Sequence, residues 1–141
     1  MERNNIYAVI DTNVLVSALL SSDGKSNPLI VLQSVLVGNI IPVFNEEILS
    51  EYEEVLSRDK LHLQKQDIDY VINHIRRSGL VVDRTKTIDE VFPDPKDIVF
   101  YEVALSKESA YLVTGNIKHF PQKPFVVTPA EMVEILGLSA I

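Results

Sequence analysis

The sequence predicts an α/β protein of three layers, in which helices cover both faces of a mostly parallel sheet of about five strands. Three observations lead to this prediction. Short apolar runs alternate along the chain with segments of helical periodicity, an order typical of parallel sheets. The length of 141 residues suits one domain with a sizeable core. Hydrophobic residues make up 46% of the chain, which indicates a folded protein. We therefore expect a single domain over residues 1–141.

The first part of the predicted sheet comes from two apolar runs with helices between them. Residues 6–10 predict a buried strand, and the helix that follows it stops near Leu20, at the turn over 21–24. Asn27 is the expected N-cap of a second helix, which has a proline in its first turn. Residues 40–44 predict the second strand.

Two amphipathic helices follow the second strand. Asn45 is the expected cap of the first, with acidic residues at its positive end. The apolar residues of this helix fall on one stripe: Ile48, Tyr52, Val55 and Leu56. Residues 66–78 have the same periodicity, and Gly79 is the expected stop. A short third strand over 80–82 and a polar connection over 83–93 come next.

The last part of the chain supplies two helices and two strands. Residues 94–106 predict a fifth helix, with Asp94 as its N-cap and a proline in its first turn. Apolar runs predict the last two strands over 110–114 and 125–127. A capping box, Thr128-Pro129-Ala130-Glu131, begins the final helix, which we expect to end at Gly137.

Composition and charge exclude several classes of protein. The chain has no cysteine, which excludes a disulfide framework, a thiolate zinc site and a cysteine nucleophile. The formal net charge of -7 argues against coating nucleic acid by bulk charge, but not against contact through bound cations. No apolar segment is long enough for a signal peptide or a membrane span, so we expect a cytoplasmic protein.

Polar residues occur where the predicted strands end, which is where sites form in parallel sheets. Asp11 follows the first strand and Asn116 the fourth, while Asp94 and Asp97 begin the fifth helix. One face of the third helix is polar and consists of Glu47, Ser50, Glu51 and Glu54. Converging carboxylates repel unless they are protonated or bind a cation. Oxygen ligands favour Mg²⁺ or Mn²⁺, so the pattern indicates metal-assisted phosphodiester hydrolysis.

Each of these residues also has a purely structural explanation. Asp11 and Asp94 could be helix caps. Asp97 could favour the dipole of its helix, and most acids of the third helix could be solvated surface. Asn116 could be a left-handed turn residue after Gly115. The residues alone leave both explanations open.

Four motifs occur in order along the chain. They are Asp11-Thr12-Asn13, Ser50-Glu51-Tyr52 with Val55-Leu56-Ser57-Arg58, Asp94-Pro95-Lys96-Asp97, and the run from Leu112 to Phe120. Together they resemble the motifs of the PIN-domain ribonuclease family, and within it the VapC-like toxin components of toxin–antitoxin systems. The segment 126–131 also resembles this branch. The resemblance covers about residues 6–137 and implies a PIN-like α/β/α fold.

The resemblance implies an endonuclease that hydrolyses RNA with Mg²⁺ or Mn²⁺. It gives Asp11, Glu51 and Asp97 as metal ligands and catalytic residues. At the fourth catalytic position, where many relatives have an aspartate, the candidates are Asn116 and His119. The supporting residues are Thr12, Asn13, Asp94 and Thr114. The resemblance also implies an antitoxin partner and a homodimer or higher homo-oligomer, with no membrane association.

Candidate RNA contacts come from two places in the chain. Residues 58–86 are locally basic and include Arg76 and Arg77, although an ordinary solvated helix face explains this segment equally well. The fourth motif adds Lys118 and His119. His119 could instead be a turn residue that packs on the surface.

Two other functions are compatible with parts of the pattern. An uncharged Asn116 suits a catalytically weak PIN scaffold that binds RNA or a protein. An aspartyl-phosphate phosphotransferase would want a second aspartate two residues after Asp11, where the chain has Asn13, so we disfavour it.

Overall fold

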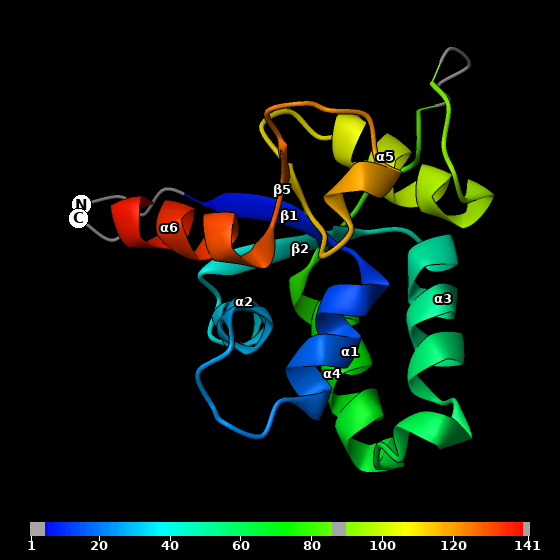
Figure 1. Cartoon of the computed structure of the whole chain (residues 1–141), viewed down its shortest axis with the longest axis vertical. Coiled ribbons are helices and arrows are strands. Elements are labelled where there is room, and N and C mark those ends of the chain that lie inside the picture. The colour runs from blue at the N-terminus through cyan, green and yellow to red at the C-terminus, as the bar shows by residue number, and fades with distance from the viewer. Residues whose placement is uncertain (1–4, 86–89, 140–141) are drawn as a thin grey trace.

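A computed structural model describes residues 5–85 and 90–139 of the chain, so part of the connection predicted over 83–93 lies outside the described residues. The centre of the fold is a parallel sheet of five strands (Figure 1). The strands are β1 (Ile6–Ile10), β2 (Ile40–Phe44), β3 (Leu80–Val81), β4 (Tyr111–Val113) and β5 (Val126–Val127). Their order in the sheet is β3-β2-β1-β4-β5. The last three strands are shorter than the apolar runs predict.

Helices cover both faces of the sheet, which confirms the predicted three-layer architecture. The α-helices of the described chain are α1 (Thr12–Leu20), α2 (Asn27–Leu36), α3 (Glu46–Leu56), α4 (Lys65–Ser78), α5 (Ile98–Leu105) and α6 (Pro129–Ser139). Short 3-10 turns are η1 (Asp59–Leu61), η2 (Pro95–Asp97) and η3 (Ile117–His119). In Figure 1, α5 lies above the sheet and α1, α2 and α4 lie below it. None of the helices described here is long and apolar enough to cross a membrane.

The order of the strands in the sheet changes direction at the boundary between β1 and β4. From β1 the chain builds outwards to β2 and β3, and it then crosses to the other side for β4 and β5. Ligand sites in open parallel sheets lie beyond the carboxyl ends of the strands at such a reversal. Asp11 directly follows β1 and Thr114 directly follows β4, so these two residues flank the reversal.

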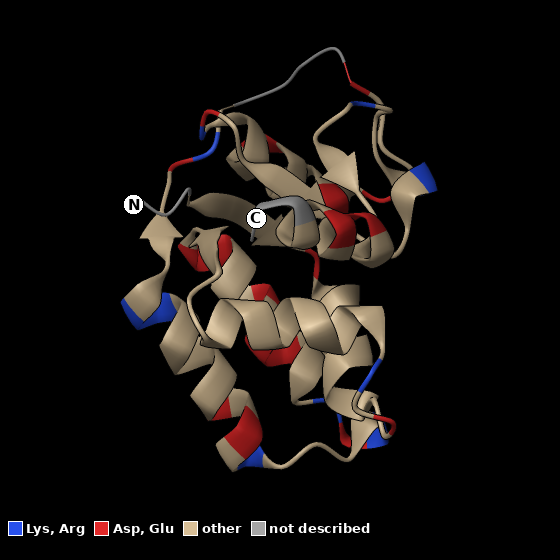
Figure 2. Ribbon diagram, turned by 90° about the vertical axis from the view of Figure 1, so that its left-hand side faces the viewer, with Lys and Arg blue, Asp and Glu red and all other residues tan. Residues whose placement is uncertain are grey.

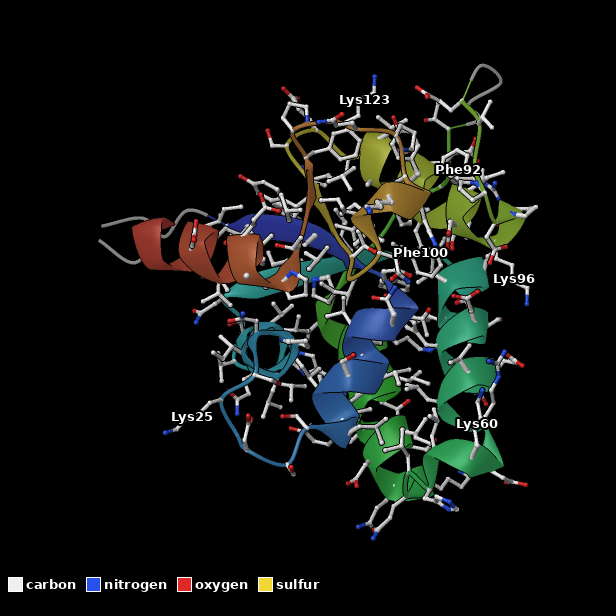
Figure 3. All side chains as sticks on the ribbon, viewed as in Figure 1. Lys25, Lys60, Phe92, Lys96, Phe100 and Lys123 are labelled. Carbon is white, nitrogen blue, oxygen red and sulfur yellow. The ribbon has the colours of Figure 1, made fainter. Side chains whose placement is uncertain are left out.

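Buried aromatic residues connect the sheet to the helices on its two sides. Phe100 of α5, labelled in Figure 3, is fully buried. Its ring lies 6.3 Å from the ring of Tyr52 in α3. The Tyr52 hydroxyl donates a hydrogen bond of 2.5 Å to the carbonyl oxygen of Ile10. Burial raises the pKa of Tyr52 well above its usual value, so the hydroxyl remains a donor. Helix α3 is therefore attached to the last residue of β1, immediately before Asp11.

Two of the predicted helix caps are confirmed by their hydrogen bonds. The Asn45 side chain accepts a bond of 2.9 Å from the amide of Ile48 at the start of α3. Thr128 and Glu131 form the expected capping box of α6. The Thr128 amide donates to the Glu131 carboxylate at 2.9 Å, and the Glu131 amide donates to the Thr128 hydroxyl at 3.1 Å.

Three helix boundaries differ from the predicted ones. The N-cap of α2 is Ser26 rather than Asn27, because the Ser26 hydroxyl accepts the hydrogen bond from the amide of Leu29. The segment predicted as one helix from Asp94 begins with η2, and α5 starts only at Ile98. Helix α6 continues through Gly137 to residue 139, since a glycine lowers the stability of a helix without ending it.

Gly79 follows the last residue of α4, at a close approach between two backbones. Its φ is -88°, so the left-handed conformation that often ends a helix is absent at this residue. A Cβ atom at this position would lie 2.5 Å from the carbonyl oxygen of Pro42 and 2.6 Å from that of Ile75. The end of α4 therefore approaches β2 at a distance that only glycine allows.

We predict that Gly79→Ala destabilises the protein by about 2 kcal/mol or more, because the added methyl group overlaps two backbone oxygens. Gly137→Ala is the matched control. A Cβ at Gly137 meets no atom within 4 Å, so alanine should stabilise α6 by about 0.5–1 kcal/mol. Urea unfolding followed by circular dichroism measures both effects, and equal changes in the two variants would contradict the close-approach explanation.

Candidate active site

Asp11 is buried at the reversal of the sheet, with 5% of its surface exposed. Its Oδ2 atom accepts two hydrogen bonds, one of 2.7 Å from the Thr114 hydroxyl and one of 2.9 Å from the Asn13 side-chain amide. Although Asp11 occupies the N-cap position of α1, its side chain forms no capping hydrogen bond. The helix-cap explanation of this residue is therefore wrong, and its carboxylate is oriented by the neighbours that the sequence predicts as supporting residues.

Glu51 differs from the other acids of α3 in its burial and in its partner. It is half-buried, whereas Glu46, Glu47, Glu53 and Glu54 are exposed. The hydroxyl of Thr12 donates a hydrogen bond of 2.6 Å to Glu51 Oε2. Thr12 lies at the start of α1, next to Asp11, so this bond joins α3 to the segment that carries Asp11.

Asp97 brings the start of α5 to the same region. Its Oδ2 atom is buried and has no hydrogen-bond partner among the described residues. The Nδ1 atom of His119 lies 3.4 Å from it, without the geometry of a hydrogen bond. Burial raises the pKa of Asp97, and the nearby His119 opposes this rise. A buried carboxylate oxygen without a donor is costly, and a bound cation is one of the few ways to offset that cost.

The charges of the three acids interact. Burial raises the pKa of Asp11 to about 6, and the hydrogen bond from Thr114 opposes this rise. The negative charges of Asp97 and Glu51 raise the same pKa further. The region therefore attracts either protons or a cation, because each added negative charge makes the others harder to maintain.

The donor set fits a hard divalent cation in chemical type and in charge, since it consists of carboxylate oxygens and includes the unpartnered atom of Asp97. In the arrangement described, however, no group of three or more histidine, aspartate and glutamate side chains lies close enough together to hold a metal ion. Two of the acids are instead held by hydrogen bonds, Asp11 by Thr114 and Asn13, and Glu51 by Thr12.

Two predicted site residues lie at the margin of this region. Asp94 is exposed, and its side chain accepts a hydrogen bond of 3.0 Å from the amide of Lys96, so it caps η2. The Lys96 side chain extends outwards (Figure 3). Asn116 is exposed, with a φ of -122°, so its interpretation as a left-handed turn residue is wrong. Its backbone amide donates a hydrogen bond of 2.9 Å to the Thr114 hydroxyl.

The candidate RNA contacts divide between the two sides of the molecule. His119 faces Asp97, and Lys118 precedes it on η3, at the rim of a hollow of about 370 Å³. Arg76 and Arg77 lie in the last turn of α4. Arg76 forms an ion pair of 2.8 Å with Glu46, which is not one of the three predicted metal ligands.

Ion pairs neutralise much of the basic segment predicted over residues 58–86. Its paired cations are Arg58 with Glu54, Lys65 with Asp69, Arg76 with Glu46, and Arg84 with Glu47 and Glu102. Lys86 lies outside the described residues. Figure 2 shows acidic residues near the middle of the view and basic residues mostly around its margin. The segment therefore forms a less basic surface than its sequence indicates.

The buried carboxylate of Glu102 and its partner Arg84 are not among the residues that the sequence predicts for the site. Glu102 is the only acid in the apolar segment of α5, and this isolation was the signal that could have revealed it. Its side chain is 3% exposed and pairs with Arg84 at 2.6 Å. Partial burial lowers the pKa of Arg84, and hydrogen bonds to Glu102 and Glu47 more than offset this, so the pKa is raised.

We predict that the protein loses stability as the pH rises from about 4 to about 6 in the absence of divalent metal. The Asp11 pKa of about 6 in the folded protein exceeds its ordinary value of 3.8, so the folded state binds this proton more tightly than the unfolded state. The resulting stabilisation is present below the unfolded value and is lost as the pH rises through 6, a change of about 3 kcal/mol.

Asp11→Asn provides the comparison for this pH dependence. An asparagine can keep both hydrogen bonds, because Thr114 and Asn13 donate to the same oxygen of Asp11. Urea unfolding at several pH values between about 4 and 7 should show the wild type losing stability relative to Asp11→Asn. A difference that stays constant with pH would contradict the raised pKa.

The chain was compared with protein families, with curated proteins and with solved structures. A family model described as PIN domain matches residues 7–118, a segment that contains Asp11, Glu51 and Asp97. No curated protein and no solved structure matches significantly. The family match covers more than half of the chain, and PIN domains are generally nucleases. This protein is therefore a member of the PIN-domain family and has a nuclease fold.

Proposed function

We propose that the protein is an endoribonuclease that depends on Mg²⁺ or Mn²⁺. One observation supports this proposal above the others, namely the coupled carboxylates of Asp11, Glu51 and Asp97 at the carboxyl edge of the sheet. The buried Oδ2 atom of Asp97 supports the same proposal, because it has no hydrogen-bond partner among the described residues and only His119 Nδ1 at 3.4 Å beside it.

In this proposal, Asp11, Glu51 and Asp97 hold the ion. A divalent cation in such a site supplies charge stabilisation to a phosphodiester and lowers the pKa of a bound water. The surrounding residues orient the ligands, because Thr114 and Asn13 fix the carboxylate of Asp11. No side chain needs to act as a nucleophile. The residue at the fourth position, Asn116, contributes an amide oxygen at most and no negative charge.

We extend the proposal to a VapC-like toxin that acts on cytoplasmic RNA and is blocked by an antitoxin. The four sequence motifs support this extension. The same resemblance supports self-association into a homodimer or higher homo-oligomer. Growth arrest on induced expression, relieved by Asp11→Asn or by a small gene adjacent on the chromosome, tests the toxin role. Unimpaired growth during expression of folded wild-type protein would count against it.

A catalytically weak PIN scaffold that binds RNA is the second candidate function. It is favoured by the hydrogen-bonded arrangement of the acids, which among the described residues gathers no three of them into a metal-holding group. Such a scaffold would bind RNA oligonucleotides without cleaving them at any concentration of Mg²⁺ or Mn²⁺. Parallel binding and cleavage assays at one salt concentration separate the two functions.

We predict that Glu51→Gln and Asp97→Asn each lower the rate of RNA cleavage at least about a hundredfold, because each removes a charged ligand. Glu54→Gln is the matched control on the same helix, since Glu54 is exposed and pairs with Arg58. Cleavage of fluorogenic RNA and DNA oligonucleotides with Mn²⁺ measures both the effect and the substrate class. Equal losses in Glu51→Gln and Glu54→Gln would contradict the assigned ligands, as would wild-type cleavage in excess chelator.

We also predict that Mg²⁺ or Mn²⁺ raises the melting temperature of the wild type. A ligand at a hundred times its dissociation constant stabilises the folded state by about 2.7 kcal/mol, provided that it does not bind the unfolded chain. Asp11→Asn should show a much smaller shift. Differential scanning fluorimetry at millimolar metal measures this effect, and the absence of a shift in the wild type would argue against an intact metal site.

A further inference from the structure

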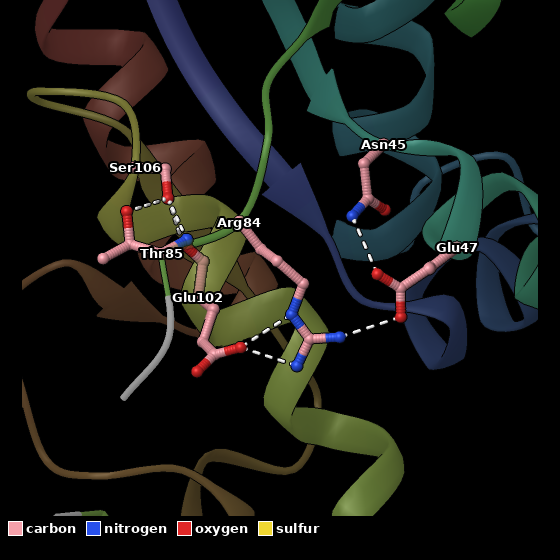
Figure 4. A network of polar contacts seen from close by, with 6 residues as sticks. All are labelled: Asn45, Glu47, Arg84, Thr85, Glu102 and Ser106. Atoms are coloured by element: carbon pink, nitrogen blue, oxygen red, sulfur yellow. Dashed lines mark hydrogen bonds and ion pairs between the residues drawn. The ribbon is translucent and has the colours of Figure 1, made fainter. Parts of the chain in front are cut away.

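Glu47, Arg84 and Glu102 form a bridge between α3, which carries Glu51, and α5, which begins directly after Asp97 (Figure 4). We call these three residues the Arg84 bridge. Arg84 follows β3, and its planar guanidinium group contacts a carboxylate of α5 on one side and a carboxylate of α3 on the other. The bridge lies outside the group of acids described above, and neither the family match nor the proposed function gives it a role.

The contact with α5 is a fixed attachment. Arg84 Nε donates to Glu102 Oε1 at 2.7 Å, and Arg84 Nη2 lies 2.6 Å from the same oxygen. Only 3% of the Glu102 side chain is exposed. Separating a buried carboxylate from its cation is strongly unfavourable, because the charge left behind has no water to solvate it.

The residue after Arg84 strengthens this attachment. The amide of Thr85 donates a hydrogen bond of 2.7 Å to the hydroxyl of Ser106, at the end of α5. The Ser106 hydroxyl is also 2.7 Å from the carbonyl oxygen of Glu102. Residues 84–85 are therefore held along one turn of α5. This contact fixes the backbone position of Arg84, from which its guanidinium group extends to α3.

The contact with α3 reaches the helix one turn before Glu51. Arg84 Nη1 lies 2.8 Å from Glu47 Oε2, and the other oxygen of Glu47 accepts a bond of 3.5 Å from the Asn45 side chain. Residues four apart lie on the same face of a helix, so Glu47 and Glu51 are neighbours on α3. Glu102 similarly follows Asp97 by little more than one turn.

We propose that Arg84 is a positioning residue that sets the separation of α3 and α5, and with it the separation of Glu51 and Asp97. Tyr52 attaches α3 to the end of β1, and the Thr12–Glu51 hydrogen bond joins α3 to the start of α1. The Arg84 bridge adds a direct polar link from the first turn of α3 to α5. The effect of Arg84 on metal binding rests on the proposed function, whereas its effect on the separation of α3 and α5 does not.

Two adjacent acids of α3 provide a matched pair of variants. Glu46 and Glu47 are both exposed, both lie in the first turn, and each forms an ion pair of 2.8 Å. Glu46→Ala removes the ion pair between α3 and Arg76 of α4, whereas Glu47→Ala removes the ion pair through which Arg84 connects α3 to α5. The two variants lose the same charge from adjacent residues, and Arg84→Lys, which keeps both carboxylates and the cation, controls for the different distances of Glu46 and Glu47 from Glu51.

The first experiment measures helix separation without metal. Because the chain has no cysteine, spin labels attach only at introduced positions, Glu53→Cys on α3 and Leu105→Cys on α5, both of which are exposed. Pulsed electron paramagnetic resonance should show a broader distance distribution in Glu47→Ala than in Glu46→Ala or the wild type. Identical distributions in the two alanine variants would overturn the proposal.

The second experiment measures the affinity for Mn²⁺ by calorimetry. We expect Mn²⁺ to bind roughly fivefold more weakly to Glu47→Ala than to the wild type, because the loss of the Arg84 contact changes the orientation of the ligands. The affinity of Glu46→Ala should change by less than about twofold. Arg84→Lys should behave like Glu47→Ala, since a lysine keeps the buried charge pair but cannot contact both carboxylates as a fork. Melting temperatures without metal should agree between the two alanine variants.

The outcomes distinguish the two proposals. A wild type that binds no Mn²⁺ would defeat the proposed function, while the spin-label comparison would still decide the role of Arg84. A wild type that binds Mn²⁺ with the same affinity as Glu47→Ala and Arg84→Lys would overturn the positioning role alone.

Discussion

The burial of the Asp11 carboxylate between two parallel strands constrains the rest of the site. Strands β1 and β4 pair in register up to Ile10 and Val113, so the next residue on each strand meets its counterpart, and Thr114 donates to Asp11. A carboxylate at this depth needs donors or a cation. The chain supplies side-chain donors from two places, Thr114 at the end of β4 and Asn13 at the start of α1. The polar end of the sheet is thus organised around one buried acid.

The other two acids reach this position by different routes, because neither belongs to the sheet. Glu51 depends on the placement of α3, which Tyr52 attaches to the carbonyl oxygen of Ile10. Asp97 depends on the junction between η2 and α5, which packs against β1 and β4. The geometry of the acids is therefore a property of tertiary packing. Contacts outside the site, such as those of Arg84 with α3 and α5, therefore bear on where these acids lie.

The sequence predicts those parts of the fold that local physics decides. The run over β1, the stripe on α3 and the capping box at Thr128 each have a periodic or short-range signal, and the structure confirms them. Serine and asparagine are similarly good N-caps, so the sequence does not distinguish Ser26 from its neighbour Asn27. The prediction of Asn27 as the cap of α2 is wrong, because the N-cap is Ser26. For the site, the strand-end rule predicts that Asp11 lies near the residues after β4. The partners of Arg84 are 37 and 18 residues away, and no local pattern specifies which acid a distant cation will meet.

The shortness of the outer strands has a consequence for how copies of this molecule can associate. β3 and β5 border the sheet, and each has two residues. Edge strands are templates for pairing with another chain, and their length limits the number of backbone hydrogen bonds that they can offer. In the part of the chain that the structure describes, neither border can support a continuous sheet across two molecules, although Val81 is 63% exposed there. Pairing at either border would therefore contribute few hydrogen bonds to an assembly, and the same shortness disfavours growth of the open sheet into fibrils.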